Sequence, residues 1–125
     1  MVRRAETAQE KILKRLREIC LAMPAAEEVR TWDHPTFRVA KKTFAVLEEY
    51  KGVLSIAFKV GRRDQDLFLK DPRFYKTPYI GKFGWVSLRA DGKLNWTEVK
   101  HLVRESYRLV APAMMRDHVS NTRRG

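Results

Sequence analysis

The stretch "YKTPYIGKFGWVSL", residues 75–88, places four aromatic side chains, two lysines and two glycines within fourteen residues. Lysines on loops contact phosphates, and aromatic rings beside them stack on bases or wedge between them. Gly81 and Gly84 also permit a tight turn with positive φ ahead of a strand. The residues alone therefore allow either a stacking-and-charge surface or a turn that leads into a buried strand.

The charge of the chain favours a polyanionic partner. Twenty-six lysines and arginines face fifteen aspartates and glutamates, which gives a net charge of +11. Lysines in two turns, Lys41-Lys42 and Asp91-Gly92-Lys93, form two wings of a predicted nucleic-acid surface, with DNA as the favoured ligand. Phosphate contacts would dominate, so binding should weaken steeply with salt and show little sequence preference. The predicted contact residues are Arg38, Lys41, Lys42, Lys76, Tyr79, Lys82, Trp85, Arg89 and Lys93.

The strand that begins at Trp85 leaves the role of this tryptophan open. If Val86 and Leu88 face the core, alternation turns Trp85 and Arg89 to the other side of the sheet. There Trp85 is either an exposed aromatic residue with a binding role or part of a second covered face. Tyr79, in the preceding turn, is open to the same two interpretations.

Two further hypotheses use other surfaces. A small-ligand pocket, with or without catalysis, would need Trp32, His34, Tyr79 and Lys82 to converge in one concave site. A hydrogen-bonded loop role is the alternative for Trp32 and His34. A chaperone-like adaptor that holds an acidic partner would instead show an apolar patch beside the basic one, and it could be a monomer or a homodimer.

Residue patterns of common catalytic and metal sites are missing from the sequence. His34, His101 and His118 are scattered, and the single cysteine, Cys20, falls on an apolar helical face. No phosphate-binding glycine loop or nucleophile elbow occurs. Adjacent carboxylates such as Glu48-Glu49 point to opposite faces of a strand, which argues against acid–base partnership. We therefore predict a protein that is not an enzyme and needs no metal or cofactor.

The hydrophobic pattern predicts helices and a largely antiparallel sheet. Apolar residues at helical spacing indicate a helix over residues 7–23, and residues 96–110 form a second amphipathic segment that Asn95 and Glu98 begin as a capping box. Strands are expected at 37–40, 43–48 and 52–60, and again at 85–89 with a short return after an Asp91-Gly92 turn. A short helix is expected over 62–71. Helices packed on one face of this sheet make a two-layer α+β domain.

Length and composition fit one globular domain over residues 1–125, with termini 1–6 and 119–125 expected to be frayed. No apolar run approaches the ~20 residues that a membrane span needs. No apolar segment follows the N-terminal arginines, so a secretory signal is not predicted. With one thiol, a cytoplasmic location is expected.

Three segments carry a resemblance to a known family: "TWDHPTFRVAKKTFA" (31–45), "TPYIGKFGWVSLRADGKLNWTEV" (77–99) and "ESYRLVAPAMM" (105–115). In this order they resemble the MmcQ/YjbR family of small bacterial proteins, over roughly residues 12–118. The resemblance implies an α-β(3)-α-β(2)-α arrangement similar to secretion chaperones. It also implies the DNA binding that is commonly assigned to the family through a proposed double-wing motif. The segment "VGRRDQDLFLKDPRF" is more basic than expected of the family, which favours a nucleic-acid ligand.

Overall fold

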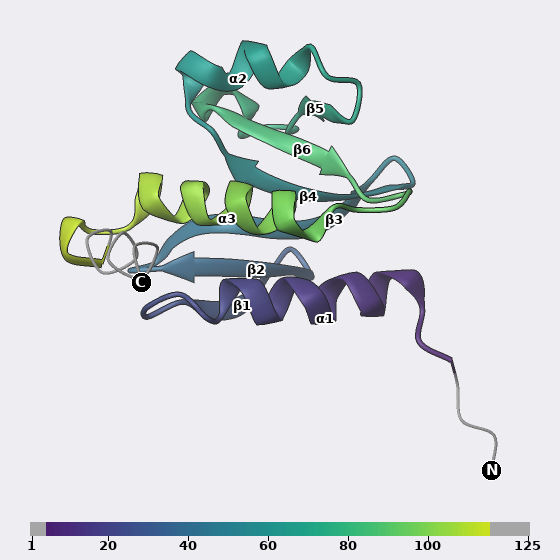
Figure 1. Ribbon diagram of the computed structural model, residues 1–125, viewed down its shortest axis with the longest axis horizontal. Coiled ribbons are helices and arrows are strands. Elements are labelled where there is room, and N and C mark those ends of the chain that lie inside the picture. The colour runs from purple at the N-terminus through teal and green to yellow at the C-terminus, as the bar shows by residue number, and fades with distance from the viewer. Residues whose placement is uncertain (1–4, 116–125) are drawn as a thin grey trace.

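The computed structural model describes residues 5–115 and shows one six-stranded antiparallel sheet with the strand order β1-β2-β3-β4-β6-β5 (Figure 1). The first helix precedes four consecutive strands, and a second helix leads to the last two strands and the third helix. The elements are α1 (Ala8–Cys20), β1 (Glu27–Thr31), β2 (His34–Val39), β3 (Lys42–Tyr50), β4 (Val53–Lys59), α2 (Arg62–Leu69), β5 (Phe74–Lys76), the 3-10 turn η1 (Gly81–Phe83), β6 (Trp85–Arg89) and α3 (Trp96–Val110).

Two-residue turns join the first four strands. Their central pairs are Trp32-Asp33, Ala40-Lys41 and Lys51-Gly52, and all six residues have positive φ, between 50° and 81°. Positive φ at both central positions is the pattern of type I′ turns, whose twist matches that of the paired strands. Five of these six residues are not glycine, so the hairpins hold side chains in a conformation that L-residues enter at a cost.

One face of the sheet carries the core. The register places Leu47 beside Ile56 and Ile56 beside Leu88, and all three are buried. A bulge interrupts the pairing of β2 with β3. Phe37 pairs with Ala45 and Arg38 pairs with Thr43, so Phe44 has no partner on β2. A bulge shifts the alternation of side chains, and as a result both Phe44 and Ala45 are buried.

The helices pack on this face. Leu16 and Cys20 of α1 and Val99, Val103 and Tyr107 of α3 belong to the core cluster. Phe68 of α2 packs edge-on against Phe74 with ring centroids 5.2 Å apart. Figure 1 shows α3 lying across the front of β3 and β4 and α2 beside β5 and β6. The sequence-based prediction of a two-layer α+β fold is thus confirmed, with α1 and α3 close to their predicted bounds.

A buried serine ties α3 to the sheet. The Ser106 hydroxyl donates to the carbonyl of Phe44 at 2.6 Å and accepts from the Lys59 amide at 2.9 Å. Tyr107, the next residue, donates from its hydroxyl to the carbonyl of Pro24 at 2.6 Å. These bonds fix the carboxyl-terminal half of α3 over the ends of β3 and β4.

Two sequence-based expectations are corrected. Strand β1 was missed because its sequence, "EEVRT", has one apolar residue and forms a sheet edge, where polar side chains are tolerated. The prediction of a return strand after Asp91-Gly92 was wrong, since residues 90–95 contain no strand and lead directly to α3. The partner of β6 on that side is β5, which arrives earlier in the chain. The predicted frayed termini lie almost wholly outside the described residues.

Candidate functional sites: a basic sheet end and an aromatic pocket

The antiparallel topology sorts the predicted binding residues to two ends of the sheet. At the first, β2 and β4 finish and β6 begins just after Lys82; we call this the Lys82 end. At the second, β1 finishes and β2 begins around Trp32; we call this the Trp32 end. In Figure 1 the arrowhead of β2 marks the Lys82 end on the left, and the arrowhead of β6 marks the Trp32 end on the right.

The Lys82 end gathers exposed basic side chains from separate segments. Lys41 and Lys42 come from the β2–β3 turn, Lys76 from the end of β5 and Lys82 from η1, while Arg62 begins α2. The Arg62 Nε donates to the Lys82 carbonyl at 3.0 Å, which holds α2 against η1. Within residues 5–115, none of these five side chains forms an ion pair with a carboxylate. Their charge therefore faces solvent.

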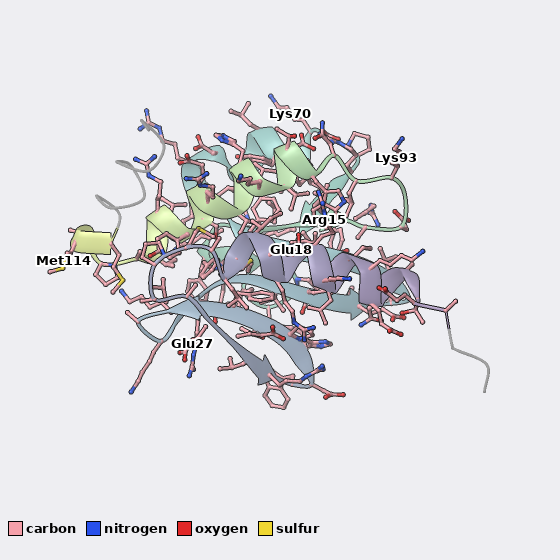
Figure 2. The ribbon with its side chains drawn as sticks, turned by 60° about the horizontal axis from the view of Figure 1, so that its bottom comes forward. Arg15, Glu18, Glu27, Lys70, Lys93 and Met114 are labelled. Carbon is pink, nitrogen blue, oxygen red and sulfur yellow. The ribbon has the colours of Figure 1, made fainter. Side chains whose placement is uncertain are left out.

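Other predicted contact residues lie elsewhere or are engaged. The Arg38 Nε donates to Glu27 at 2.6 Å, so its charge is neutralised locally. Arg89 ends β6 at the Trp32 end and lies over the Tyr75 ring, 4.9 Å from its centroid. Lys93 follows Arg89 at the same end. In Figure 2 it lies on the opposite side of the view from Met114, which comes after the carboxyl-terminal end of α3. The two predicted wings thus stand at opposite ends of the sheet and do not form one contiguous surface.

The glycines of "GKFG" have a structural role, because they allow a tight turn and close contacts with neighbouring segments. Gly84 has φ +88° and ends η1, and a β-carbon there would lie 2.6 Å from the Gly61 carbonyl carbon. A β-carbon on Gly81 would meet the Lys76 side chain at 2.5 Å. Gln65 of α2 closes this junction, because its amide donates to the carbonyls of Gly81 at 2.6 Å and Trp85 at 2.9 Å. The motif therefore builds the turn that presents Lys82.

The two aromatic residues left open by the sequence have different fates. Trp85 is 6% exposed, so it belongs to a covered face and is not free to stack on a base. Tyr79 is 90% exposed. At the Lys82 end Phe83 is exposed, and its ring centroid lies 5.3 Å from the Lys82 ammonium.

A pocket of about 670 Å³ lies on the sheet face that the helices do not cover. Residues 77–80, which follow β5, form one wall, and residues of the first three strands form the other. Thr77 fixes the loop to β6 through a hydrogen bond of 2.9 Å between its hydroxyl and that of Ser87. Trp32, His34 and Tyr79, three of the four residues of the predicted ligand pocket, line this cavity; the fourth, Lys82, does not.

The pocket has an unusual wall for so basic a chain. Glu48 and Glu49 line it, and no lysine or arginine occurs among its described lining residues. The register of β2 and β3 pairs Thr36 with Val46, so two residues farther along His34 stands across from Glu48. Burial raises the pKa of the Glu48 carboxyl, and the nearby His34 partly opposes that shift. Trp32 and Tyr79, with φ of 52° and 67°, hold strained left-handed backbones at the same cavity.

Metal and thiol chemistry find no site in the part of the chain that the structure describes. No group of three or more histidine, cysteine, aspartate or glutamate side chains is placed to hold a metal ion there. Burial raises the pKa of the Cys20 thiol well above its ordinary value, which suits a core residue rather than a nucleophile. Among the described helices, none is long and apolar enough to cross a membrane.

Comparisons with known proteins agree with this fold. The family model YjbR matches residues 21–109. The chain belongs to the YjbR family. A Deinococcus radiodurans protein with a DUF419 domain superposes with a TM-score of 0.70 at 20% identity, over 86% of this chain and 87% of that one. A Pseudomonas syringae protein superposes with a TM-score of 0.67 at 20% identity, over 77% of this chain and 96% of that one. A comparison with curated proteins found no match.

Sequence reasoning missed two residues that the fold brings into these sites. Arg62 joins the Lys82 end only because the β4–α2 connection packs against Gly84, a contact over twenty residues of sequence. Glu48 was set aside as a neighbour of Glu49, yet its position opposite His34 places it in the pocket wall. The usable signal was alternation, which puts Glu48 on the same face of β3 as Val46.

Proposed function

We propose that this YjbR-family protein binds nucleic acid, with DNA the favoured ligand, through the Lys82 end of its sheet. The observation that carries the proposal is the presence at this one end of the sheet of five exposed basic side chains without carboxylate partners among the described residues. They arise from four separate segments, which makes the cluster a product of the fold rather than of one charged run. They are Lys41, Lys42, Arg62, Lys76 and Lys82.

These groups suit contact with a phosphate backbone. Lysine and arginine side chains release counterions when they neutralise phosphates. This electrostatic contribution to the binding free energy does not depend on the base sequence. Phe83, half-exposed beside Lys82, takes the stacking role that the sequence had offered to Trp85. We therefore expect an affinity governed by charge and a weak preference among sequences. Binding of an acidic protein by these lysines is the alternative hypothesis, and it stays a prediction.

The test compares two variants with equal loss of charge. Lys42→Glu/Lys82→Glu reverses two charges at the Lys82 end. Lys70→Glu/Lys93→Glu reverses two charges outside it, at the exposed sites labelled in Figure 2. Each variant and the wild-type chain is titrated into a fluorescent duplex of about 20 base pairs at about 50 mM and about 200 mM salt, and anisotropy is read. Heparin competes in a parallel series.

With five phosphate contacts, affinity should fall about 500-fold between those salt concentrations, since the logarithmic slope is about −0.9 per contact. The Lys82-end variant should bind at least about tenfold more weakly than wild type and show a shallower slope. The control variant should lose much less. Equal losses in both variants would mean that net charge alone attracts the duplex, and the proposal would be abandoned.

A further inference from the structure

The pocket on the uncovered face of the sheet, between the Trp32 turn and the loop of residues 77–80, combines carboxylates, exposed aromatic rings and apolar walls in one cavity. Its volume, about 670 Å³, falls in the range of about 300–1,000 Å³ that holds small ligands. Val46, Pro78 and Ile80 supply apolar surface from the sheet and from the loop. This cavity opens on the sheet face opposite the helices, and none of the five basic residues of the Lys82 end lines it, although its loop wall, residues 77–80, lies between Lys76 and Lys82 in the chain.

The sign of the charge selects the kind of ligand. The chain carries +11, yet the charged side chains among the described lining residues are Glu48 and Glu49, with His34 beside them; the nearby Lys51 ammonium lies over the ring of Tyr50. Phosphates and carboxylates would meet like charge here, whereas a cation would meet opposite charge. The half-buried Glu48 has no hydrogen bond or ion pair from another described residue, although burial of a carboxylate without such a partner is unfavourable.

The aromatic side chains point to an organic cation rather than a hydrated metal ion. Trp32 and Tyr79 are 89% and 90% exposed, and within residues 5–115 neither ring is covered by a basic side chain. Faces of tryptophan and tyrosine attract ammonium groups. Tyr50 already does so, with the Lys51 ammonium 5.4 Å from its ring centroid. The left-handed backbones of Trp32 and Tyr79 hold both rings at this cavity.

We infer that this pocket binds a small organic cation, a protonated amine carried on an apolar or aromatic body, with Glu48 as its counter-ion. Trp32 and Tyr79 contact the body or the ammonium group, and His34 lies across from Glu48 on the neighbouring strand. No covalent step is involved.

The test uses three probes that share an indole ring and differ in charge: tryptamine, neutral tryptophol and anionic indolepropionate. Amide chemical-shift changes are followed in the isotope-labelled full chain during each titration. Tryptamine should shift the amides of Trp32, His34, Glu48 and Tyr79 and should bind at least about tenfold more tightly than tryptophol, a difference of about 1.4 kcal/mol, since only the amine forms a charge-assisted bond with the Glu48 carboxylate. Indolepropionate should bind most weakly.

Two substitutions identify the residues responsible. Glu48→Gln keeps the shape of the side chain and should bring the affinity for tryptamine down to that for tryptophol. Glu18→Gln removes one carboxylate from α1, on the helical side of the molecule (Figure 2), and should leave the affinity unchanged. The spectrum of each unliganded variant verifies that it is folded. Equal binding of the three probes, no shifts at the pocket, or tryptamine binding unaffected by Glu48→Gln would overturn the inference.

Discussion

Gly84 and Gly61 touch backbone to backbone where η1 meets the start of α2. A β-carbon at Gly84 would lie 2.6 Å from the Gly61 carbonyl carbon and 2.7 Å from the Arg62 nitrogen. The Gly84 carbonyl accepts from the amides of Val60 at 2.8 Å and Gly61 at 3.0 Å. This contact brings Arg62 and Lys82 together, so the second glycine of "GKFG" has a structural role from which the basic surface follows.

The first prediction concerns Gly84→Ala. The substitution adds a methyl group against rigid backbone and places a β-carbon at φ +88°. The conformational term alone is about 1–2 kcal/mol, and the clash adds to it. Gly52→Ala is the matched control, because Gly52 has φ +81° but a β-carbon added there would meet no atom within 4 Å. Urea unfolding should show a larger loss for Gly84→Ala; equal losses would contradict the role of the Gly61 contact.

The second prediction concerns the fully buried Ser106. Ser106→Ala removes a donor to the buried Phe44 carbonyl and an acceptor for the partly buried Lys59 amide, which leaves both backbone groups without this partner. The free energy of unfolding should fall by about 1–3 kcal/mol. Thermal or urea unfolding measures the change. Ser106→Thr retains the hydroxyl and should recover part of it, whereas a loss below about 0.5 kcal/mol for the alanine variant would show that water replaces both bonds.

Much of this fold follows from local patterns in the sequence. The apolar spacing of α1 and α3 and the Asn95 cap specify both helices, and β4 and β6 are rich in β-branched and aromatic residues. Strand β1 could not be found in this way, since its one apolar residue, Val29, pairs with Thr36 on the face opposite the helices, and Glu28 occupies the helix side, where it binds Arg17 of α1. The β2–β3 turn was placed one residue late, because the bulge at Phe44 shifts the alternation from which the turn was read.

The candidate sites were less predictable, because they depend on which ends of strands meet. In the sequence, Lys41 and Lys93 are both lysines in predicted turns, and nothing local distinguishes them. Only the strand order shows that they lie at opposite ends of the sheet. The Trp85 side chain is 6% exposed, and its carbonyl accepts from Gln65 of α2 and from the Thr77 amide after β5, which are tertiary contacts with no local signal. Residue type alone was enough to propose that Trp32, His34 and Tyr79 line one pocket. It was not enough to propose that Glu48 belongs to the wall of that pocket.

The third prediction concerns the thiol of Cys20. This side chain is wholly buried in the core, and burial raises its pKa well above the ordinary value, so the thiolate that alkylating reagents need is scarce. Iodoacetamide should therefore leave the folded chain unmodified and label it fully in denaturant, as read by mass spectrometry. Rapid labelling of the folded chain at neutral pH would show that α1 detaches readily from the core.

The fourth prediction links stability to the pocket through Glu48. Burial raises the folded-state pKa of its carboxyl above the unfolded value, so folding favours the protonated form. The stability contribution of this group is fully present below the unfolded pKa and is lost as the pH rises through the folded pKa. Glu48→Gln should therefore raise the free energy of unfolding at neutral pH, by less than about 1 kcal/mol because the carboxyl is only half-buried.

Unfolding experiments at neutral and acidic pH test the sign of that effect. The advantage of Glu48→Gln should shrink toward zero as the pH falls below the unfolded pKa of the carboxyl, where wild-type Glu48 is protonated in both states. Glu18→Gln supplies the baseline for removal of a carboxylate from an exposed helix position. A variant that is more stable yet no longer prefers an amine would show that the carboxylate is held at the pocket for binding, at a cost in folding stability. Lower stability of Glu48→Gln at neutral pH would mean instead that Glu48 stabilises the sheet, and its proposed role as a counter-ion would lose this support.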